Sequence, residues 1–475
     1  MRRRDFLNVS GSALASTAAR SLSAPLTALA ASDALAAPGE DYRALVCVFL
    51  FGGLDNYDTV IPYDAASHAR WAQIRGPLLG QYPVPRSTAN LLPLTTPARF
   101  GARQFALPPE MPGLHALYQQ GNAAVVGNVG PLVQPTDAAQ FASGAAVLPP
   151  RLFSHNDQQS TWMSGGTEGA QFGWAGQIHD ALLQAGVSSP NTFSAVTMSA
   201  GELLITGAET SPYHLVGGAA LEPTLLQSGI VSRPIEDVPY FGADTVSVAG
   251  LPSNLVEHFK AASSAHDGLL EQDVDRLLRS SFAANARFKS AVAPSGASAG
   301  FPADPFGLQL RSVFEVMQAR STLGARRQLF VVTMGGFDTH SDQPGALPEL
   351  QARLDAGISA FYAACQRAGL DQCTTLFTAS DFGRTLAVNG DGTDHGWAGH
   401  HFVVGGRVNG GTIYGDLPPA EFGHALDAGA GRLIPSMSIE QYGANFAGWL
   451  GLDDTRIGAV FPNLSSFSPR LYMML

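Results

Sequence analysis

The sequence predicts an α/β fold with a mostly parallel central sheet that helices cover on both faces. Two apolar runs, residues 328–334 and 373–379, carry this prediction, because they are rich in β-branched residues and do not alternate with polar ones. Between them apolar residues recur at steps of three and four, as in the crossover helix that parallel strands require. These residues are Leu347, Leu350, Leu354, Ile358, Phe361 and Cys365, with Gly369 at the helix end.

Shorter elements extend the sheet. Residues 44–51 predict the first buried strand, and residues 123–127 and 193–198 predict two short central strands. A final helix is expected after Ser438, because Gln441 three residues later completes a capping-box pattern.

Residues 37–475 are expected to form one α/β domain, since no charged or low-complexity linker interrupts them. Strand signals weaken over residues 200–310, which contain a helical patch at 255–288. We interpret residues 200–310 as an insertion that covers the site.

The start of the chain resembles a twin-arginine signal. Arg2, Arg3 and Arg4 precede a small-residue stretch that ends in an A-x-A pattern at residues 34–36. Residues 1–36 are therefore expected to be a signal peptide, and the mature protein to be periplasmic or secreted. Because this pathway exports folded proteins, a metal would be inserted before export.

Composition excludes some partners. The formal net charge is −11, and Lys260 and Lys289 are the two lysines of the chain. An acidic chain poor in lysine does not suit nucleic acid or an anionic membrane. Beyond the predicted signal peptide there is no uninterrupted apolar run of about 18 residues, so no integral membrane segment is expected. Cys365 and Cys373 flank Gly369, either as a disulfide or as two buried thiols.

Acids and histidines follow the predicted strands. Asp338 and His340 come after Gly335-Gly336, Asp381 follows residues 373–379, and His395 lies shortly beyond. Carboxyl ends of parallel strands meet at one sheet edge, where α/β enzymes keep their chemistry. Carboxylate and imidazole donors suit zinc, which we expect here. The alternative is that each residue is a helix cap or a hydrogen-bonded histidine.

Two more residues were considered at this edge. Asp55 follows a glycine pair after residues 44–51 and is a third candidate carboxylate. Ser154 is placed to cap a helix, whose terminal amides would also stabilise an adjacent anion.

Together these motifs resemble the exported bacterial family called domain of unknown function 1501, in the alkaline phosphatase-like superfamily. The resemblance covers nearly the whole mature chain, and the motifs are more specific for the family than for a reaction. They are Gly52-Gly53-Leu54-Asp55, Ser154-His155 with Gln158 and Trp162, and the runs 335–340, 380–385 and 393–396.

The resemblance implies an alkaline phosphatase-like fold with two divalent ions at the carboxyl ends of the sheet and a nucleophile at a helix start between them. Ser154 is the implied nucleophile. By position, Asp338, His340 and His395 would hold one ion, and Asp55 and Asp381 the other.

Phe382 departs from this pattern, because superfamily phosphatases have a metal-binding histidine after the second-site aspartate. The second site is then empty, or is completed by His155 or Asn389, or holds calcium, magnesium or manganese on oxygen ligands. No Cys-x-Pro-Ser-Arg motif is present, so a formylglycine sulfatase is not expected.

Two functions follow. The first is a periplasmic metal-dependent hydrolase of phosphate or sulfate esters, acting on a small molecule or a polymer, in which the metal activates the nucleophile. Arg384 would then bind substrate oxygens in a fork, unless it forms a structural salt bridge. The second is a non-catalytic exported accessory or binding protein that keeps the scaffold and works beside an exported partner protein.

Overall fold

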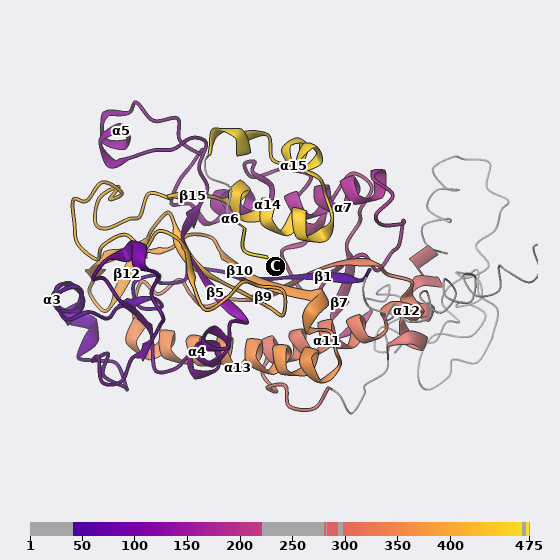
Figure 1. Ribbon diagram of the computed structural model, residues 1–475, viewed down its shortest axis with the longest axis horizontal. Coiled ribbons are helices and arrows are strands. Elements are labelled where there is room, and N and C mark those ends of the chain that lie inside the picture. The colour runs from indigo at the N-terminus through magenta and orange to yellow at the C-terminus, as the bar shows by residue number, and fades with distance from the viewer. Residues whose placement is uncertain (1–40, 221–279, 282, 293–297, 468–471, 475) are drawn as a thin grey trace, which may run out of the picture. The chain divides into compact units, whose positions relative to one another are not determined.

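Strand β1 (Arg43–Leu50) lies at the centre of the sheet, between β9 (Arg327–Met334) and β10 (Thr374–Ser380), and runs parallel to both (Figure 1). The computed structural model describes residues 41–220, 280–281, 283–292, 298–467 and 472–474. The predicted signal peptide and residues 221–279 of the predicted insertion lie outside these ranges. All elements below belong to the compact unit that begins at Arg43.

The sheet has the order β14-β5-β13-β10-β1-β9-β6-β7-β8, and β15 also pairs with β5. Strands β13 and β8 pair antiparallel to their neighbours, and the other pairs are parallel. The mostly parallel α/β prediction is therefore confirmed. The remaining strands are β5 (Ala123–Gly130), β6 (Ala195–Thr197), β7 (Tyr213–Val216), β8 (Ala219–Ala220), β13 (Gly399–Gly405), β14 (Ile413–Gly415) and β15 (Met437–Ser438).

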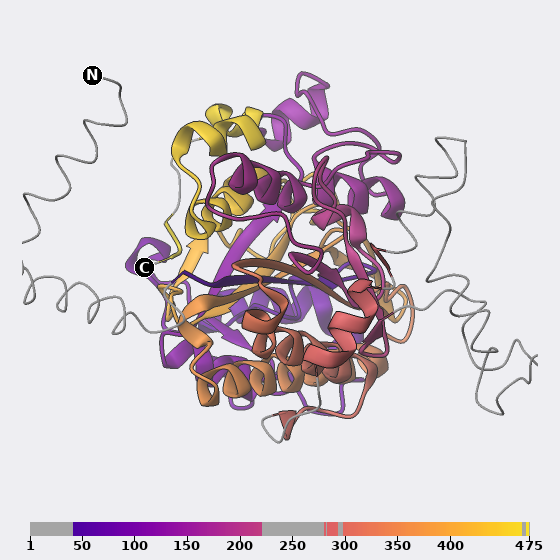
Figure 2. The same cartoon turned by 90° about the vertical axis from the view of Figure 1, so that its right-hand side faces the viewer.

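Helices cover both faces of the sheet, as predicted. Figures 1 and 2 show α7 and α14 on one side and α11 and α13 on the other. On the first side are α6 (His155–Ser164), α7 (Trp174–Gln184), α14 (Ile439–Leu450) and α15 (Asp454–Val460), and on the second α4 (Pro112–Gln119), α11 (Pro305–Gln318) and α13 (Gln343–Arg367). The short helix α8 (Glu202–Ile205) packs against α6 and α7.

Smaller elements lie beside these layers. They include two small sheets, with the strand orders β2-β4-β3 and β11-β12. They are β2 (Ile61–Pro62), α3 (Ala65–Leu79), β3 (Leu92–Pro93), η1 (Ala98–Phe100), β4 (Phe105–Leu107), α5 (Ala138–Ser143), α12 (Arg320–Leu323), η5 (Asp371–Cys373), β11 (Arg384–Asn389), β12 (Gly392–His395) and η6 (Pro462–Ser466).

The predicted crossover helix is α13, which connects β9 to β10. All six of its predicted apolar residues are buried, and the chain leaves the helix through Gly369 at a φ of 65°. The capping box of α14 is also confirmed, since the Ser438 side chain accepts from the Gln441 amide.

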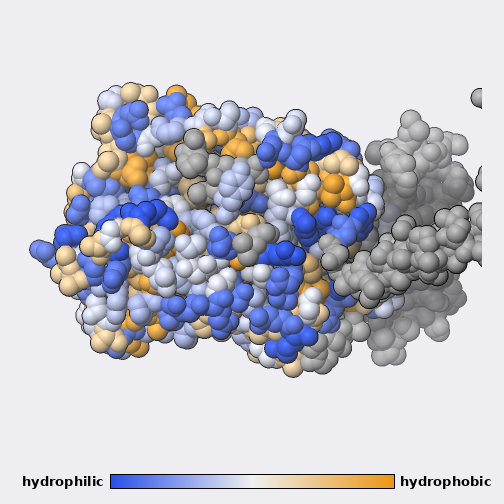
Figure 3. Space-filling model, viewed as in Figure 1, coloured by the Kyte–Doolittle hydropathy of each residue, from blue (hydrophilic) through white to orange (hydrophobic). Residues whose placement is uncertain are grey.

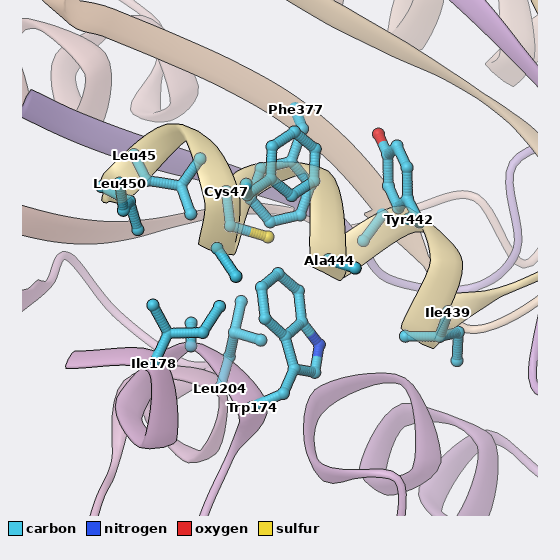
Figure 4. Packing of buried hydrophobic residues seen from close by; sticks show 14 of the residues in the cluster. Leu45, Cys47, Trp174, Ile178, Leu204, Phe377, Ile439, Tyr442, Ala444 and Leu450 are labelled. Carbon is cyan, nitrogen blue, oxygen red and sulfur yellow. The ribbon is translucent and has the colours of Figure 1, made fainter. Parts of the chain in front are cut away.

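Aromatic packing joins the sheet to α7 and α14. Figure 4 shows Trp174 of α7 reaching toward Cys47 of β1 and Phe377 of β10. The rings of Phe377 and Phe446 stack with centroids 4.5 Å apart. Each such buried side chain contributes roughly 1.5–3 kcal/mol, so this core holds the strand ends in place. The three cysteines are buried free thiols, the second of the two arrangements considered for Cys365 and Cys373.

On the face drawn in Figure 3, hydrophobic residues form small patches separated by hydrophilic ones. None of the helices in the described part of the chain is long and apolar enough to cross a membrane.

Candidate metal centre

Three adjacent parallel strands end level with one another. Leu50 of β1 is in register with Met334 of β9 and with Ser380 of β10. Polar residues that follow β9 and β10 therefore meet at one sheet edge, as expected for an α/β site. Asp338 and His340 leave the end of β9, and Asp381 leaves the end of β10.

The turn after β1 lies against these residues and requires glycine. Gly52 and Gly53 have φ angles of 113° and 97°. A Cβ atom on Gly52 would lie 2.3 Å from the Asp338 nitrogen, and one on Gly53 would lie 2.6 Å from the Phe382 ring. Because neither glycine has a side chain, the turn packs directly against Asp338 and Phe382.

The carboxylate of Asp338 lies among three imidazoles. Its Oδ1 is 3.1 Å from Nε2 of His340 and 3.2 Å from Nε2 of His395. Its Oδ2 is 3.4 Å from Nε2 of His155. We call His155, Asp338, His340 and His395 the His–Asp cluster. Ligand atoms of His155, Asp338 and His395 lie within 4.8 Å of one another, the spacing of a group that can hold a metal ion.

Two imidazoles of the cluster have an oxygen of the protein behind the ring. Nδ1 of His395 lies 2.8 Å from the Phe153 carbonyl oxygen, and Nδ1 of His155 lies 2.6 Å from Oδ2 of Asp381. Both oxygens accept hydrogen bonds, so with a proton on each Nδ1 the Nε2 lone pairs of His155 and His395 point toward the cluster. Nε2 of His155 is buried and makes no hydrogen bond, which leaves it available as a ligand.

His340 completes the group from the exposed side. Its Nδ1 lies 3.3 Å from Oδ1 of Asp394, which also accepts from Asn389 at 3.0 Å. Its Nε2 lies 2.8 Å from Nε2 of His395. Two nitrogen lone pairs at this distance repel each other unless a cation or a shared proton lies between them. The arrangement therefore suits a metal ion.

The charges around the cluster also suit a metal. Burial lowers the pKa of His395, which favours the neutral imidazole. Burial would raise the pKa of Asp338, but the hydrogen bond and charge of Arg384 outweigh it, and the pKa is lowered. The hydrogen bond to Asp381 raises the pKa of His155 despite burial, so a proton would compete with metal there.

Arg384 is buried and its contacts are with the protein itself. Nη1 donates to Oδ1 of Asp338 at 2.8 Å and to the Gly52 carbonyl at 3.1 Å. Nε donates to Oγ1 of Thr393 at 3.2 Å, and Nη2 donates to the Thr393 carbonyl. The structure thus shows the salt-bridge alternative for Arg384, which positions Asp338.

Asp55 lies outside the cluster. Its two oxygens accept from the Arg75 guanidinium at 2.7 and 3.2 Å, and Oδ2 also accepts from Gln343 at 2.8 Å. Arg75 is a fully buried residue of α3. A buried carboxylate needs a counter-charge, and Arg75 supplies it here in place of an ion.

Asp381 and Phe382 support the cluster from behind. The Asp381 side chain is buried, and Oδ2 accepts from Gln159 at 2.8 Å in addition to its contact with His155. The Phe382 ring stacks on His395 with centroids 4.5 Å apart and lies 4.8 Å from His155. Of the two residues considered for a second site, His155 joins the cluster and Asn389 bonds Asp394. Within the described residues the structure thus gathers one group of metal ligands.

Ser154 immediately precedes His155 but does not cap α6 with its side chain. Its Oγ donates to Oδ2 of Asp157 at 2.8 Å instead. The preceding Phe153 has a φ of 71°, a strained value for a bulky residue that lets its carbonyl bond His395.

An open pocket of about 340 Å³ borders the cluster. Arg432 is the cation in its wall: Nε donates to the His395 carbonyl at 2.9 Å and Nη1 to Gly429 at 3.3 Å. The guanidinium also lies 5.4 Å from the centre of the Phe153 ring. No sequence motif surrounds Arg432, so its place in the pocket wall is not predictable from the sequence. The pocket is lined by Phe153, His340, Asp394, His395, Ala428 and Arg432.

Residues 260–454 match the model of a family described as Protein of unknown function (DUF1501). This range contains Asp338, His340, Asp381, Arg384 and His395, so the match supports the family resemblance for the part of the chain that carries most of the site. No curated protein matches the chain.

Solved structures resemble the chain at low identity. Ps i-CgsB in complex with k-i-k-neocarrahexaose is 9% identical, with 87% of this chain and 74% of that one covered and a TM-score of 0.36. A protein of glycosaminoglycan metabolism from Bacteroides thetaiotaomicron is 11% identical, with 87% and 74% covered and a TM-score of 0.35. The C-terminal periplasmic domain of EcEptC from Escherichia coli, in complex with Zn, is 12% identical, with 77% and 74% covered and a TM-score of 0.27. The residue roles below follow from the geometry of the site and not from these likenesses.

Proposed function

We propose that this protein is an exported metal-dependent hydrolase of phosphate or sulfate esters, with one divalent ion held by the His–Asp cluster. One observation carries the proposal. Three Nε2 atoms surround the Asp338 carboxylate, while each ring's Nδ1 already faces an oxygen of the protein.

The donor set fits zinc. Imidazole nitrogens with one carboxylate oxygen are common ligands of Zn²⁺, and oxygens of Asp381, Asp394 and Phe153 orient the rings from behind, as in known zinc sites. Neutral His395 and ionised Asp338 are the forms that bind metal, consistent with their lowered pKa values.

A bound divalent ion would stabilise negative charge on the transferred group and lower the pKa of a nucleophilic hydroxyl or water. Arg384 would keep Asp338 ionised and oriented. Arg432 would bind the ester's anionic oxygens, because it lines the open pocket and its Nη2 takes part in neither of its two backbone bonds. Arg384 would thus position the metal ligand Asp338, and Arg432 would bind the substrate.

Ser154 is the proposed nucleophile. Its hydroxyl donates to Asp157, a buried carboxylate placed to accept the proton as Oγ bonds to the phosphorus or sulfur. The bond to the ester oxygen breaks, and this oxygen takes a proton from water as it leaves. Water would then release the acid from Ser154.

Export of the folded, metal-loaded chain through residues 1–36 is part of the same proposal. It rests on the twin-arginine pattern at Arg2, Arg3 and Arg4 and on the A-x-A pattern at residues 34–36.

A second candidate is the non-catalytic accessory or binding protein, for which the ion would be structural. The contacts of Asp55 favour it, because Arg75 occupies both oxygens that a second ion would need. A site for one ion is compatible with either function. Turnover is what separates them.

Metal analysis tests the proposal first. Protein purified in its folded, exported form without chelator should contain about one equivalent of metal, and His340→Ala and Asp338→Ala should lose it. His340 is exposed, so its variant should fold even where loss of the Arg384 partner destabilises Asp338→Ala. Glu349→Ala, an exposed acid on α13, is the matched control and should keep the metal.

Turnover is then measured with p-nitrophenyl phosphate and p-nitrophenyl sulfate. Hydrolysis that disappears in His340→Ala and Ser154→Ala but persists in Glu349→Ala supports the hydrolase. Metal-loaded protein that cleaves neither ester supports the accessory role, and metal-free protein of unchanged stability contradicts both versions of the site.

A further inference from the structure

A second pocket, of about 170 Å³, lies between the ends of α6 and α15 and the starts of η6, α7 and α14. It shares no lining residue with the open pocket beside the metal centre. Its walls are mostly apolar. Trp174, Ile439, Val460 and Phe461 are among the apolar residues that line it.

Glu440 is the one charged side chain in this lining. Its Oε1 accepts from Nδ2 of Asn463 at 3.1 Å. Its Oε2 is buried and has no hydrogen-bond partner. Burying a carboxylate oxygen without a donor is costly, and an unsatisfied group of this kind calls for a partner that the described residues do not provide.

Two aromatic rings stand in the same wall. Trp174 and Phe461 are buried, and their ring centroids lie 6.0 Å apart. A carboxylate beside aromatic faces in an apolar pocket is the surrounding that recognises an ammonium group, since the ring faces attract a cation. An anion would be repelled by the negative charge of Glu440, and a neutral hydrocarbon would leave that charge without a counter-ion.

We propose that this pocket binds a small protonated amine with a compact apolar body, its ammonium group against the Glu440 carboxylate and its body against Trp174 and Phe461. The size is suitable, because a cavity of roughly 150 Å³ accepts a ring the size of benzene. The site does not depend on the metal centre or on the proposed hydrolase activity.

The amine would bind with a defined pH dependence. Burial raises the pKa of Glu440 to about 7, with the Asn463 hydrogen bond opposing the rise. Glu440 must be ionised to pair with an ammonium, while an alkylamine keeps its proton up to about pH 10. Affinity should therefore be full above pH 7 and fall as pH drops below it. Each unit below the pKa should weaken binding about tenfold.

The test is calorimetric titration of the full chain with benzylamine, and with benzyl alcohol as the neutral probe of the same shape. At pH 8 benzylamine should bind at least tenfold more tightly than benzyl alcohol, and binding should weaken between pH 7 and pH 5. Glu440→Gln, which keeps an oxygen for Asn463, should remove the preference for the amine. Glu349→Gln should leave it unchanged.

Val460→Phe is a second variant, which narrows the pocket from another wall without touching Glu440. It should weaken both probes, and circular dichroism establishes that it is folded. Equal binding of the two probes, unchanged benzylamine binding in Glu440→Gln, or no binding at millimolar benzylamine would each overturn the proposal. Repeating the titration with His340→Ala should give the wild-type result, because that variant alters only the metal centre.

Discussion

The Nε2 atoms of His340 and His395 lie 2.8 Å apart, while the other nitrogen of each ring faces an oxygen of the protein. With the ring protons on the two Nδ1 atoms, the two Nε2 lone pairs point at each other. A metal ion bound to both nitrogens would relieve this repulsion. The predictions below test this relationship and the residues that enforce it.

Replacing Asp381 should weaken metal binding although it lies behind a ligand. In Asp381→Asn, the amide oxygen is a weaker acceptor for Nδ1 of His155, so the ring is less firmly oriented. Loss of such a supporting contact typically costs 10–100-fold in metal affinity. Competition with a fluorescent zinc chelator measures the change. An affinity equal to that of Asp371→Asn, a control on η5, would contradict the supporting role of Asp381.

His155 makes the stability of metal-free protein depend on pH. The hydrogen bond to Asp381 raises the folded-state pKa of His155 above its ordinary value of about 6.5. A raised pKa stabilises the fold most below pH 6.5, and this contribution is lost as pH rises through the folded-state pKa. Chelator-treated protein should show this loss in urea unfolding, relative to His155→Gln.

Metal affinity should show the opposite trend in the same pH range, because the proton on His155 must leave before metal binds. Zinc affinity that stays constant from pH 6 to pH 8 would show that His155 is not a ligand.

The Asp55–Arg75 pair should be structural. Asp55→Ala leaves the buried Arg75 charge without its main partner, which typically costs about 3–5 kcal/mol of unfolding free energy. The double variant Asp55→Leu/Arg75→Met removes both charges and should recover much of that loss. Urea unfolding of the single and double variants measures this coupling. Folded Asp55→Ala should keep its metal, and a loss of metal without a loss of stability would instead support Asp55 as a ligand.

Arg432 should determine how well anionic esters bind. Arg432→Gln should raise KM for p-nitrophenyl phosphate about tenfold or more while metal content stays at the wild-type level, because the Arg432 side chain bonds a backbone carbonyl of His395 and not its imidazole. Steady-state kinetics with elemental analysis separates the two effects. Arg70→Gln is the control: the Arg70 side chain of α3 is exposed, and its replacement should leave KM unchanged.

Much of the frame was predictable from local sequence. Apolar β-branched runs predict β1, β9 and β10, because a strand buried on both faces has apolar residues throughout. Apolar residues at steps of three and four predict α13, because one side of that helix is buried. Parallel pairing then brings the residues after each strand to one edge. The proximity of Asp338 to Asp381 through His155 follows from that rule.

Side-chain partners were not predictable in the same way. Asp55 and Asp338 both follow Gly-Gly turns at strand ends, yet Asp55 faces Arg75 and Asp338 faces three histidines. Arg432 reaches the pocket from a turn with no recognisable motif.

The sequence by itself thus determined the α/β class, the buried strands β1, β9 and β10 and the edge at which chemistry-bearing residues gather, since these depend on hydrophobic patterns within single segments. Only the tertiary structure decided that His155 joins His340 and His395 around Asp338, that Arg384 holds Asp338 and that Arg75 neutralises Asp55. The physical reason is that the partner of a charged or hydrogen-bonding side chain is set by packing between segments far apart in the chain, and no local pattern records it.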